Sequence, residues 1–103
     1  MWIFSQEGFF SIVHKQDGFH VRARRQRDFI NLSLIPVKSY PGSDYPWRAI
    51  LEEKTELLKL FAKLGTSVDY PNFKGRIGQR PDQKDRLGNY HKIWALMAKE
   101  EEA

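Results

Sequence analysis

The segment Phe19–Arg24 alternates between apolar and polar residues, and this period of two constrains the fold more than any other pattern in the chain. In a β-strand the three apolar residues would point to one side, and His20, Arg22 and Arg24 would point to the other. The dipeptide Asp17-Gly18 comes directly before it. Asp-Gly between apolar runs favours a hairpin, because glycine accepts the positive φ of a type I′ turn. We therefore predict a hairpin whose second strand is apolar on one side and basic on the other.

The residues before this hairpin predict two further strands. Met1–Ser5 and Phe9–Lys15 are rich in strand-forming residues, and a plausible turn that ends at Gly8 lies between them. This arrangement predicts three antiparallel strands in a meander. After them, Gln26–Leu34 has apolar residues near helical spacing, which predicts a short helix that ends before Pro36.

The second half of the chain predicts one strand and two helices. We expect a loop at residues 36–46, followed by a strand in which Trp47, Ala49 and Leu51 alternate with Arg48 and Ile50. A helix over Glu53–Leu64 should follow and end at Gly65, and Gly75–Arg80 should form an exposed loop. Asp82 should cap the last helix, which carries Leu87, Tyr90, Trp94 and Met97 on one stripe. Trp47 and Trp94 are expected in the core. The order β-β-β-α-β-α-α predicts one small α+β domain over residues 1–103. It would have a mainly antiparallel four-stranded sheet with helices on one face.

Composition limits the class of protein. The 103 residues are 41% hydrophobic and 14% aromatic, which indicates a packed globular chain. No apolar run approaches the length of a membrane span, so we expect a soluble protein. The chain has no cysteine, which rules out disulfides and fits a reducing cytoplasm. We expect no cofactor and no bound metal, since the three histidines are scattered along the sequence.

Positive charge points to an anionic partner. The net charge is +4 and the pI is about 9.5, which favours polyanions through long-range attraction. If Arg48 lies on a strand beside Arg22 and Arg24 in the same orientation, the three cations converge on one sheet face. Guanidinium groups match phosphate or carboxylate oxygens, and nearby aromatic rings could stack on bases. The alternative is an ordinary polar face whose arginines pair with nearby carboxylates, namely Glu52, Glu53 or Asp28.

The tripeptide Asp-Tyr-Pro occurs twice, in Asp44–Arg48 and in Asp69–Lys74. Proline makes each copy rigid, because it fixes its own φ and biases the preceding residue toward extended geometry. The second copy is either a structural strap anchored by its aromatic residues or a rim whose polar side chains face a ligand. Together with the arginines and a histidine of the last helix, it completes the set of candidate ligand-binding residues: Arg22, Arg24, Arg48, Asp69, Tyr70, Asn72, Lys74 and His91.

Signatures of catalysis are missing from the sequence. It has no glycine-rich phosphate loop, no serine nucleophile elbow and no two histidines at metal-ligand spacing. We therefore predict a protein that is not an enzyme and has no catalytic residues. A weaker alternative is a small enzyme in which Asp69 orients His91 for acid–base chemistry.

Several short motifs carry a resemblance to a known family. They are Met1-Trp2-Ile3-Phe4, Gly8-Phe9-Phe10-Ser11, Val21-Arg22-Ala23-Arg24, Asp44-Tyr45-Pro46-Trp47-Arg48, Asp69-Tyr70-Pro71-Asn72-Phe73-Lys74 and Tyr90-His91-Lys92-Ile93-Trp94. The chain resembles a small uncharacterised family of bacteria and their mobile elements, which has no assigned activity. A mobile-element setting implies a possible anti-defence role. The function expected from residues and resemblance together is capture of a phosphate-bearing ligand, either a nucleotide or a nucleic acid. The alternative is a protein-interaction adaptor or inhibitor.

Overall fold

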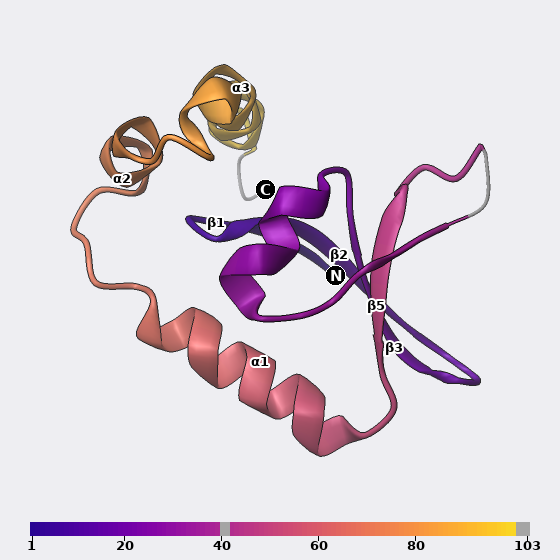
Figure 1. Ribbon diagram of the computed structural model, residues 1–103. Coiled ribbons are helices and arrows are strands. Elements are labelled where there is room, and N and C mark those ends of the chain that lie inside the picture. Colours follow the sequence, from indigo (N-terminus) through magenta and orange to yellow (C-terminus); the bar gives the residue numbers. More distant parts are fainter. Residues whose placement is uncertain (40–41, 101–103) are drawn as a thin grey trace. The chain divides into compact units, whose positions relative to one another are not determined.

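The computed structural model describes residues 1–39 and 42–100, and its chain divides into two compact units (Figure 1). The first unit is Met1–Asp69 and the second is Tyr70–Ala103. All the described strands belong to the first unit, and the described part of the second unit contains helices only. The predicted α+β class is confirmed. The prediction of one domain over residues 1–103 stays a prediction.

The first unit is built on a five-stranded antiparallel sheet with the strand order β1-β2-β3-β5-β4. The strands are β1 (Trp2–Ser5), β2 (Gly8–Lys15), β3 (Gly18–Ala23), β4 (Val37–Lys38) and β5 (Trp47–Leu51). The prediction of four strands is wrong, since β4 lies inside the expected loop at residues 36–46. This strand has two residues, too few to show an alternation. It forms because it pairs with the start of β5 and because Ser39 N–H donates to the Pro46 carbonyl at 2.7 Å.

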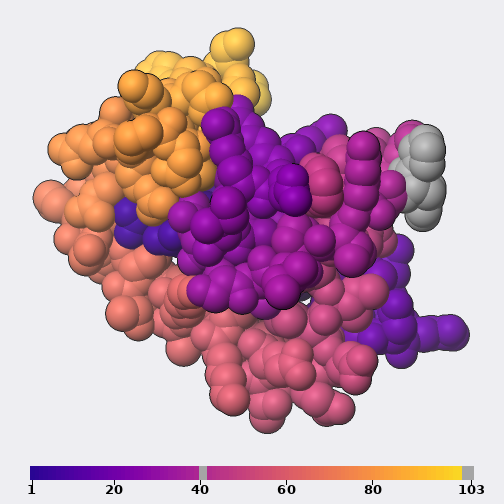
Figure 2. All heavy atoms as spheres, in the orientation of Figure 1, coloured from indigo at the N-terminus to yellow at the C-terminus, as the bar shows by residue number. Residues whose placement is uncertain are grey.

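One face of this sheet carries the core. Val21 and Ala23 are fully buried there, beside apolar residues of β2 and β5. Two helices cover this face: the 3₁₀-helix η1 (Gln26–Leu32) and the α-helix α1 (Lys54–Thr66) (Figure 1). Their buried side chains are Phe29 and Leu32 from η1, and Leu57, Leu60 and Leu64 from α1. The other side of α1 is exposed at the surface, where its first residues are pink in Figure 2. Trp47 packs against the core as predicted.

Both hairpins of the meander end their turns on a glycine. The turn residues of the second hairpin are Gln16 and Asp17, and Gly18 is the first residue of β3 with φ +129°. The predicted hairpin is confirmed but its type I′ turn is wrong. Such a turn needs positive φ at both central residues, and Ser33 is the one non-glycine residue with positive φ in the described ranges. The first hairpin repeats this pattern, with Gly8 at φ +150°.

The short helix predicted over Gln26–Leu34 is the 3₁₀-helix η1, which ends at Leu32, and three other predictions of helix or loop are wrong. The helix α1 continues through Gly65 to Thr66, because Ser67 caps it in an ordinary right-handed conformation. The expected loop over Gly75–Arg80 is mostly helical, since α2 spans Phe73–Gln79. The last helix α3 spans Leu87–Met97 and follows a 3₁₀ turn, η2 (Lys84–Arg86).

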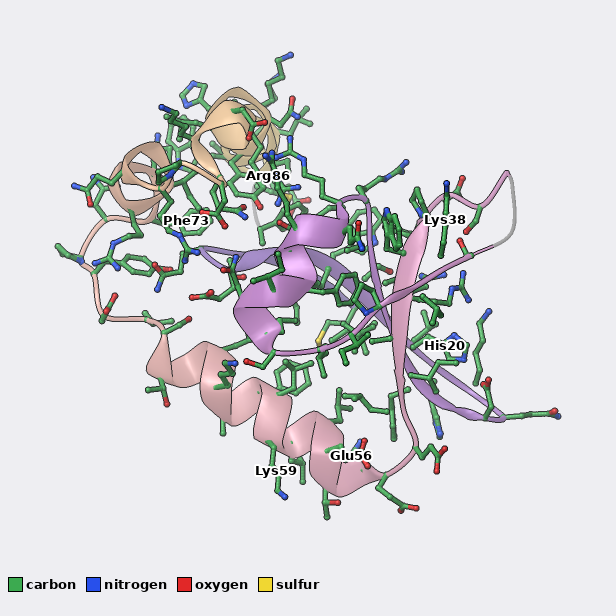
Figure 3. All side chains as sticks on the ribbon, viewed as in Figure 1. His20, Lys38, Glu56, Lys59, Phe73 and Arg86 are labelled. Atoms are coloured by element: carbon green, nitrogen blue, oxygen red, sulfur yellow. The ribbon has the colours of Figure 1, made fainter. Side chains whose placement is uncertain are left out.

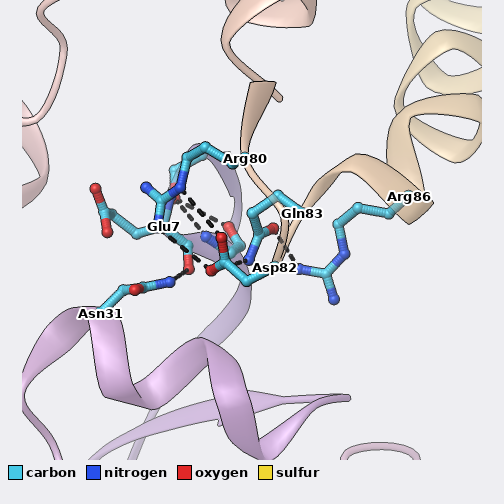
Figure 4. A network of polar contacts seen from close by, with 8 residues as sticks. Glu7, Asn31, Arg80, Asp82, Gln83 and Arg86 are labelled. Atoms are coloured by element: carbon cyan, nitrogen blue, oxygen red, sulfur yellow. Dashed lines mark hydrogen bonds and ion pairs between the residues drawn. The ribbon is translucent and has the colours of Figure 1, made fainter. Parts of the chain in front are cut away.

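Asp82 does not cap the last helix because its carboxylate is held elsewhere in the second unit. It accepts hydrogen bonds from Arg80 Nε at 3.2 Å and from Gln83 Nε2 at 3.2 Å (Figure 4). Arg86 Nη1 in turn donates to Gln83 Oε1 at 2.9 Å. Gln83 is fully buried, so this chain of polar contacts fixes the segment that leads into α3.

The structure describes no helix that is both long enough and apolar enough to cross a membrane.

Gly18 provides a test of the sheet geometry. A Cβ at this position would lie 2.5 Å from the Leu51 carbonyl oxygen, and φ is +129°. We expect Gly18→Ala to lower the free energy of unfolding by more than about 1 kcal/mol, measured by chemical denaturation. Gly65→Ala is the matched control, because its Cβ would meet nothing within 4 Å inside a helix. That control should raise stability by about 0.5–1 kcal/mol. Equal effects of the two substitutions would contradict the described strand pairing.

Candidate functional site

The sheet face opposite the core carries the predicted arginines, and we call it the arginine face. Directly paired residues of neighbouring strands point to the same side of a sheet. The pairs Trp2–Ser11, Ser11–Arg22, Arg22–Arg48 and Arg48–Val37 therefore form one row across all five strands. In Figure 3 His20, the labelled residue of β3, lies on the side of the strands that faces away from η1 and α1.

Tyr45 lies over this row and contacts two arginines. The Arg22 guanidinium carbon lies 4.6 Å from the centre of the Tyr45 ring, and that of Arg24 lies 5.1 Å from it. Arg22 Nη2 also donates to Ser11 Oγ at 2.7 Å. Tyr45 is only 9% exposed. The first Asp-Tyr-Pro copy thus places an aromatic ring against two cations, which stabilises their position through cation–π attraction.

Arg48 is held by a histidine that in turn contacts a carboxylate. His20 Nε2 lies 2.6 Å from Asp17 Oδ1, and Arg48 Nη1 lies 3.2 Å from His20 Nδ1. An ionised carboxylate only accepts and a guanidinium only donates. His20 therefore donates from Nε2 to Asp17 and accepts at Nδ1 from Arg48. These two hydrogen bonds together require the neutral tautomer of His20 that carries its proton on Nε2. Arg48 Nη2 also reaches Ser43 Oγ at 3.5 Å.

The cations of the arginine face have no carboxylate partners among the described residues. Each contact of Arg22, Arg24 and Arg48 is to a hydroxyl, an imidazole or an aromatic ring. The Nε atoms of Arg22 and Arg48 are buried and have no hydrogen-bond partner in the described part of the chain. The alternative, in which the arginines pair with acidic neighbours, is therefore wrong for Glu52, Glu53 and Asp28. Asp28 is buried and accepts from Phe9 N–H at 3.4 Å.

The eight predicted site residues fall into two groups, one in each unit. Arg22, Arg24 and Arg48 come together in the first unit, which ends at the exposed Asp69. The others belong to the second unit: Tyr70, Asn72, Lys74 and His91. The predicted convergence of both groups on one surface stays a prediction.

The second unit brings Lys74 and His91 together beside a tryptophan. Lys74 Nζ lies 3.5 Å from His91 Nδ1 and 4.6 Å from the centre of the Trp94 ring. The His91 and Trp94 rings stack at 5.5 Å. Trp94 is 57% exposed, so its predicted place in the core is wrong. A lysine ammonium and a stacked indole are thus the described neighbours of His91.

Asn72 and Tyr70 have structural roles that their local contacts explain. Asn72 caps α2, because its side-chain oxygen accepts from Gly75 N–H at 3.1 Å. Tyr70 packs at 6.1 Å against Phe73, which stacks on Tyr90 at 5.5 Å. These contacts agree with the interpretation of the second Asp-Tyr-Pro copy as a strap anchored by its aromatic residues.

Four residues that contact the arginines of this face were not among the predicted site residues: Ser11, His20, Ser43 and Tyr45. The alternation of β3 placed His20 beside the arginines, and this signal could have added it to the site. Tyr45 had a weaker signal, the repeated Asp-Tyr-Pro tripeptide. Ser11 had none, because only the register of β2 against β3 puts it opposite Arg22.

A groove of about 250 Å³ lies beside α1 in the first unit. Its floor is formed by leucines, and its polar residues belong to α1, two of which are labelled in Figure 3. The lining residues are Leu32, Leu34, Leu51, Glu56, Lys59, Leu60 and Lys63. Their charges have both signs and lie on one helix, so they do not define a ligand of one charge.

The described residues contain no group of three or more histidines or carboxylates that could hold a metal ion. A scan against protein-family models finds no model that matches the chain, and searches among curated proteins and among solved structures find no match either. The geometry and charge of the arginine face are therefore the basis for the function proposed below.

The contact between His20 and Asp17 predicts a pH dependence of stability. The hydrogen bond from His20 lowers the pKa of Asp17 below its ordinary value of 3.8. A lowered pKa stabilises the fold above the ordinary value, and this contribution is lost as the pH falls through the lowered pKa. We expect Asp17→Asn to be less stable than the natural chain at neutral pH and equally stable at strongly acidic pH. Denaturation of both proteins at a series of pH values measures this difference. An Asp17 carboxyl that titrates by NMR at or above 3.8 would contradict the contact.

The role of Asn72 can be separated from a ligand role by substitution. Asn72→Ala removes the cap of α2 and should cost about 0.5–2 kcal/mol of stability, whereas Asn72→Asp keeps an acceptor and should cost less. Thermal denaturation of the two variants measures this. If both variants keep full stability and lose anion binding, Asn72 is a ligand-contacting residue instead.

Proposed function

We propose that the protein is a non-enzymatic binding module that captures a phosphate-bearing ligand on its arginine face. The observation that carries this proposal is the direct pairing of Arg22 with Arg48 across two central strands, with no carboxylate partner for either among the described residues. Like charges directly opposite each other in a sheet are destabilising. A bound anion between them would offset that repulsion.

The position of the two guanidinium groups on adjacent strands supports a phosphate. Phosphate oxygens accept two parallel bonds from one guanidinium fork. Both Nε–H groups are buried and unpaired in the described part of the chain, which costs about 1–3 kcal/mol each, and a phosphate oxygen reaches them only when the side chains move. After such a movement, the two guanidinium groups can bind one phosphate group or two neighbouring ones.

The surroundings of the arginines hold them in place before a ligand arrives. Tyr45 lies against Arg22, and the imidazole of His20 orients Arg48. Side chains held in this way lose little rotamer freedom on binding, so more of the interaction energy appears as affinity. The net charge of +4 adds long-range attraction for anions.

Thermal shift and calorimetry with inorganic tripolyphosphate, a nucleoside triphosphate and a short oligonucleotide test this function. At low salt we expect at least one of them to raise the melting temperature, because a ligand that binds only the folded state stabilises it. Arg22→Gln and Arg48→Gln should each weaken binding by about tenfold or more. Lys59→Gln removes an exposed lysine of α1 and should leave affinity unchanged.

Two results would contradict the proposal. One is the absence of stabilisation by every anion at low salt, which would favour the alternative of a protein partner. The other is equal loss of affinity in Lys59→Gln and in the arginine variants, which would indicate nonspecific attraction to a basic protein.

A further inference from the structure

We infer that the ligand of the arginine face is single-stranded nucleic acid, whose bases stack on aromatic side chains at the β1 edge while its phosphates contact the central arginines. This inference rests on the function proposed above and names the class of ligand for the same face.

Aromatic residues occupy one end of the row that contains the arginines. Trp2 is the β1 member of this row and is 68% exposed. Two residues further along β1, Phe4 pairs with Phe9 on the same face, and their rings stack at 4.7 Å with an interplanar angle of 6°. Apolar residues on an edge strand usually give way to charges that keep the edge soluble. A large exposed indole there is consistent with a surface that binds planar rings.

The rings continue from β1 toward the cations. Phe9 lies 6.3 Å from Tyr45, and Tyr45 lies against Arg22 and Arg24. Aromatic groups and guanidinium groups therefore follow one another along the face instead of forming two patches. This is the combination that binds single strands, in which each base offers a flat face and each backbone unit offers a charge.

The extent of the row favours a strand over a nucleoside monophosphate. Neighbouring strands lie about 4.8 Å apart, so Trp2 and Arg22 are separated by about 10 Å and the five-strand row spans about 19 Å. A base on Trp2 and phosphates on both Arg22 and Arg48 require more than one phosphate group. The row thus has room for several backbone units of a strand.

Double-stranded nucleic acid does not offer the same contacts. Inside a duplex each base is covered on both faces by its neighbours, so the Trp2 indole has no free base on which to stack. The arginines would still contact duplex phosphates, and this electrostatic part depends on salt. Preference for the single strand is therefore the property that Trp2 adds to the arginines.

Fluorescence anisotropy with end-labelled oligothymidylate of about twelve nucleotides tests the inference. The competitors are unlabelled single strand, duplex of the same length and inorganic tripolyphosphate. We expect the single strand to compete at least tenfold better than the duplex and the tripolyphosphate. The logarithm of the affinity should fall with the logarithm of the salt concentration with a slope of about −2, as three phosphate contacts predict for a single strand.

Trp2→Leu is the diagnostic variant because it keeps apolar bulk but removes the stacking surface. It should weaken binding to the single strand about fivefold to a hundredfold and leave tripolyphosphate binding unchanged. Trp94→Leu is the matched control, since it removes an exposed tryptophan of the second unit and should keep full affinity. Circular dichroism and the melting temperature establish that both variants fold. Arg22→Gln should lower the salt slope by about 0.7.

The outcomes separate this inference from the function on which it rests. If tripolyphosphate binds as tightly as the single strand, or if Trp2→Leu binds the single strand as the natural chain does, the ligand is a phosphate without a stacked base and the inference is wrong. In that case the proposed phosphate function still holds. If neither the oligonucleotide nor tripolyphosphate binds at low salt, both are wrong.

Discussion

The register of β3 is the constraint on which the rest of the first unit depends. β3 lies between β2 and β5, and its alternation sends Val21 and Ala23 into the core and His20 and Arg22 to the arginine face. A shift of one residue would exchange the two faces. It would bury guanidinium groups among leucines, which costs several kcal/mol per charge. The two glycine-ended hairpin turns and the close approach of Gly18 to Leu51 hold this register.

The same register creates the candidate site. Arg22 and Arg48 oppose each other because the pairing that buries Val21 against Ala49 leaves no other place for them. The loop before β5 then brings Tyr45 over the face, while Trp47 and Arg48 turn to opposite sides as the strand begins. The short Asp-Tyr-Pro-Trp-Arg segment thus makes three contributions from neighbouring positions. Tyr45 places a ring over the arginines, Trp47 packs against the core and Arg48 adds a cation to the arginine face. Fold and site are therefore two consequences of one alternating pattern.

The sequence predicted the elements whose pattern is local and regular. The three strands of the meander, the strand Trp47–Leu51 and the opposite faces of β3 all follow from alternation and turn residues. The strand β4 could not be predicted, because two residues carry no period and its formation depends on partners nine and eleven residues away, Trp47 and Arg48. The helix α2 was missed because its two glycines suggest a loop, whereas the Asn72 cap and the apolar Phe73 and Ile77 stabilise it.

The candidate site was predicted in part for the same reason. Arg22 and Arg24 share a face through the alternation of one segment, which a sequence shows. Arg48, Ser11 and Tyr45 join them through strand register and loop conformation, which a sequence does not show. Trp94 was expected in the core because it lies on one helical stripe with Tyr90. Such a stripe does not show which of its residues pack against another element, and in the structure Tyr90 is buried whereas Trp94 is exposed.

The measurement that tests the central claim most directly is an NMR titration that observes arginine Nε–Hε signals while oligothymidylate is added at low salt. The Nε–H groups of Arg22 and Arg48 are buried and have no acceptor among the described residues, so both signals should shift when a phosphate binds to their guanidinium groups and changes their surroundings. The Nε–Hε signal of the exposed Arg27 should stay in place. Unchanged signals from Arg22 and Arg48 under conditions where the oligonucleotide binds would contradict the account.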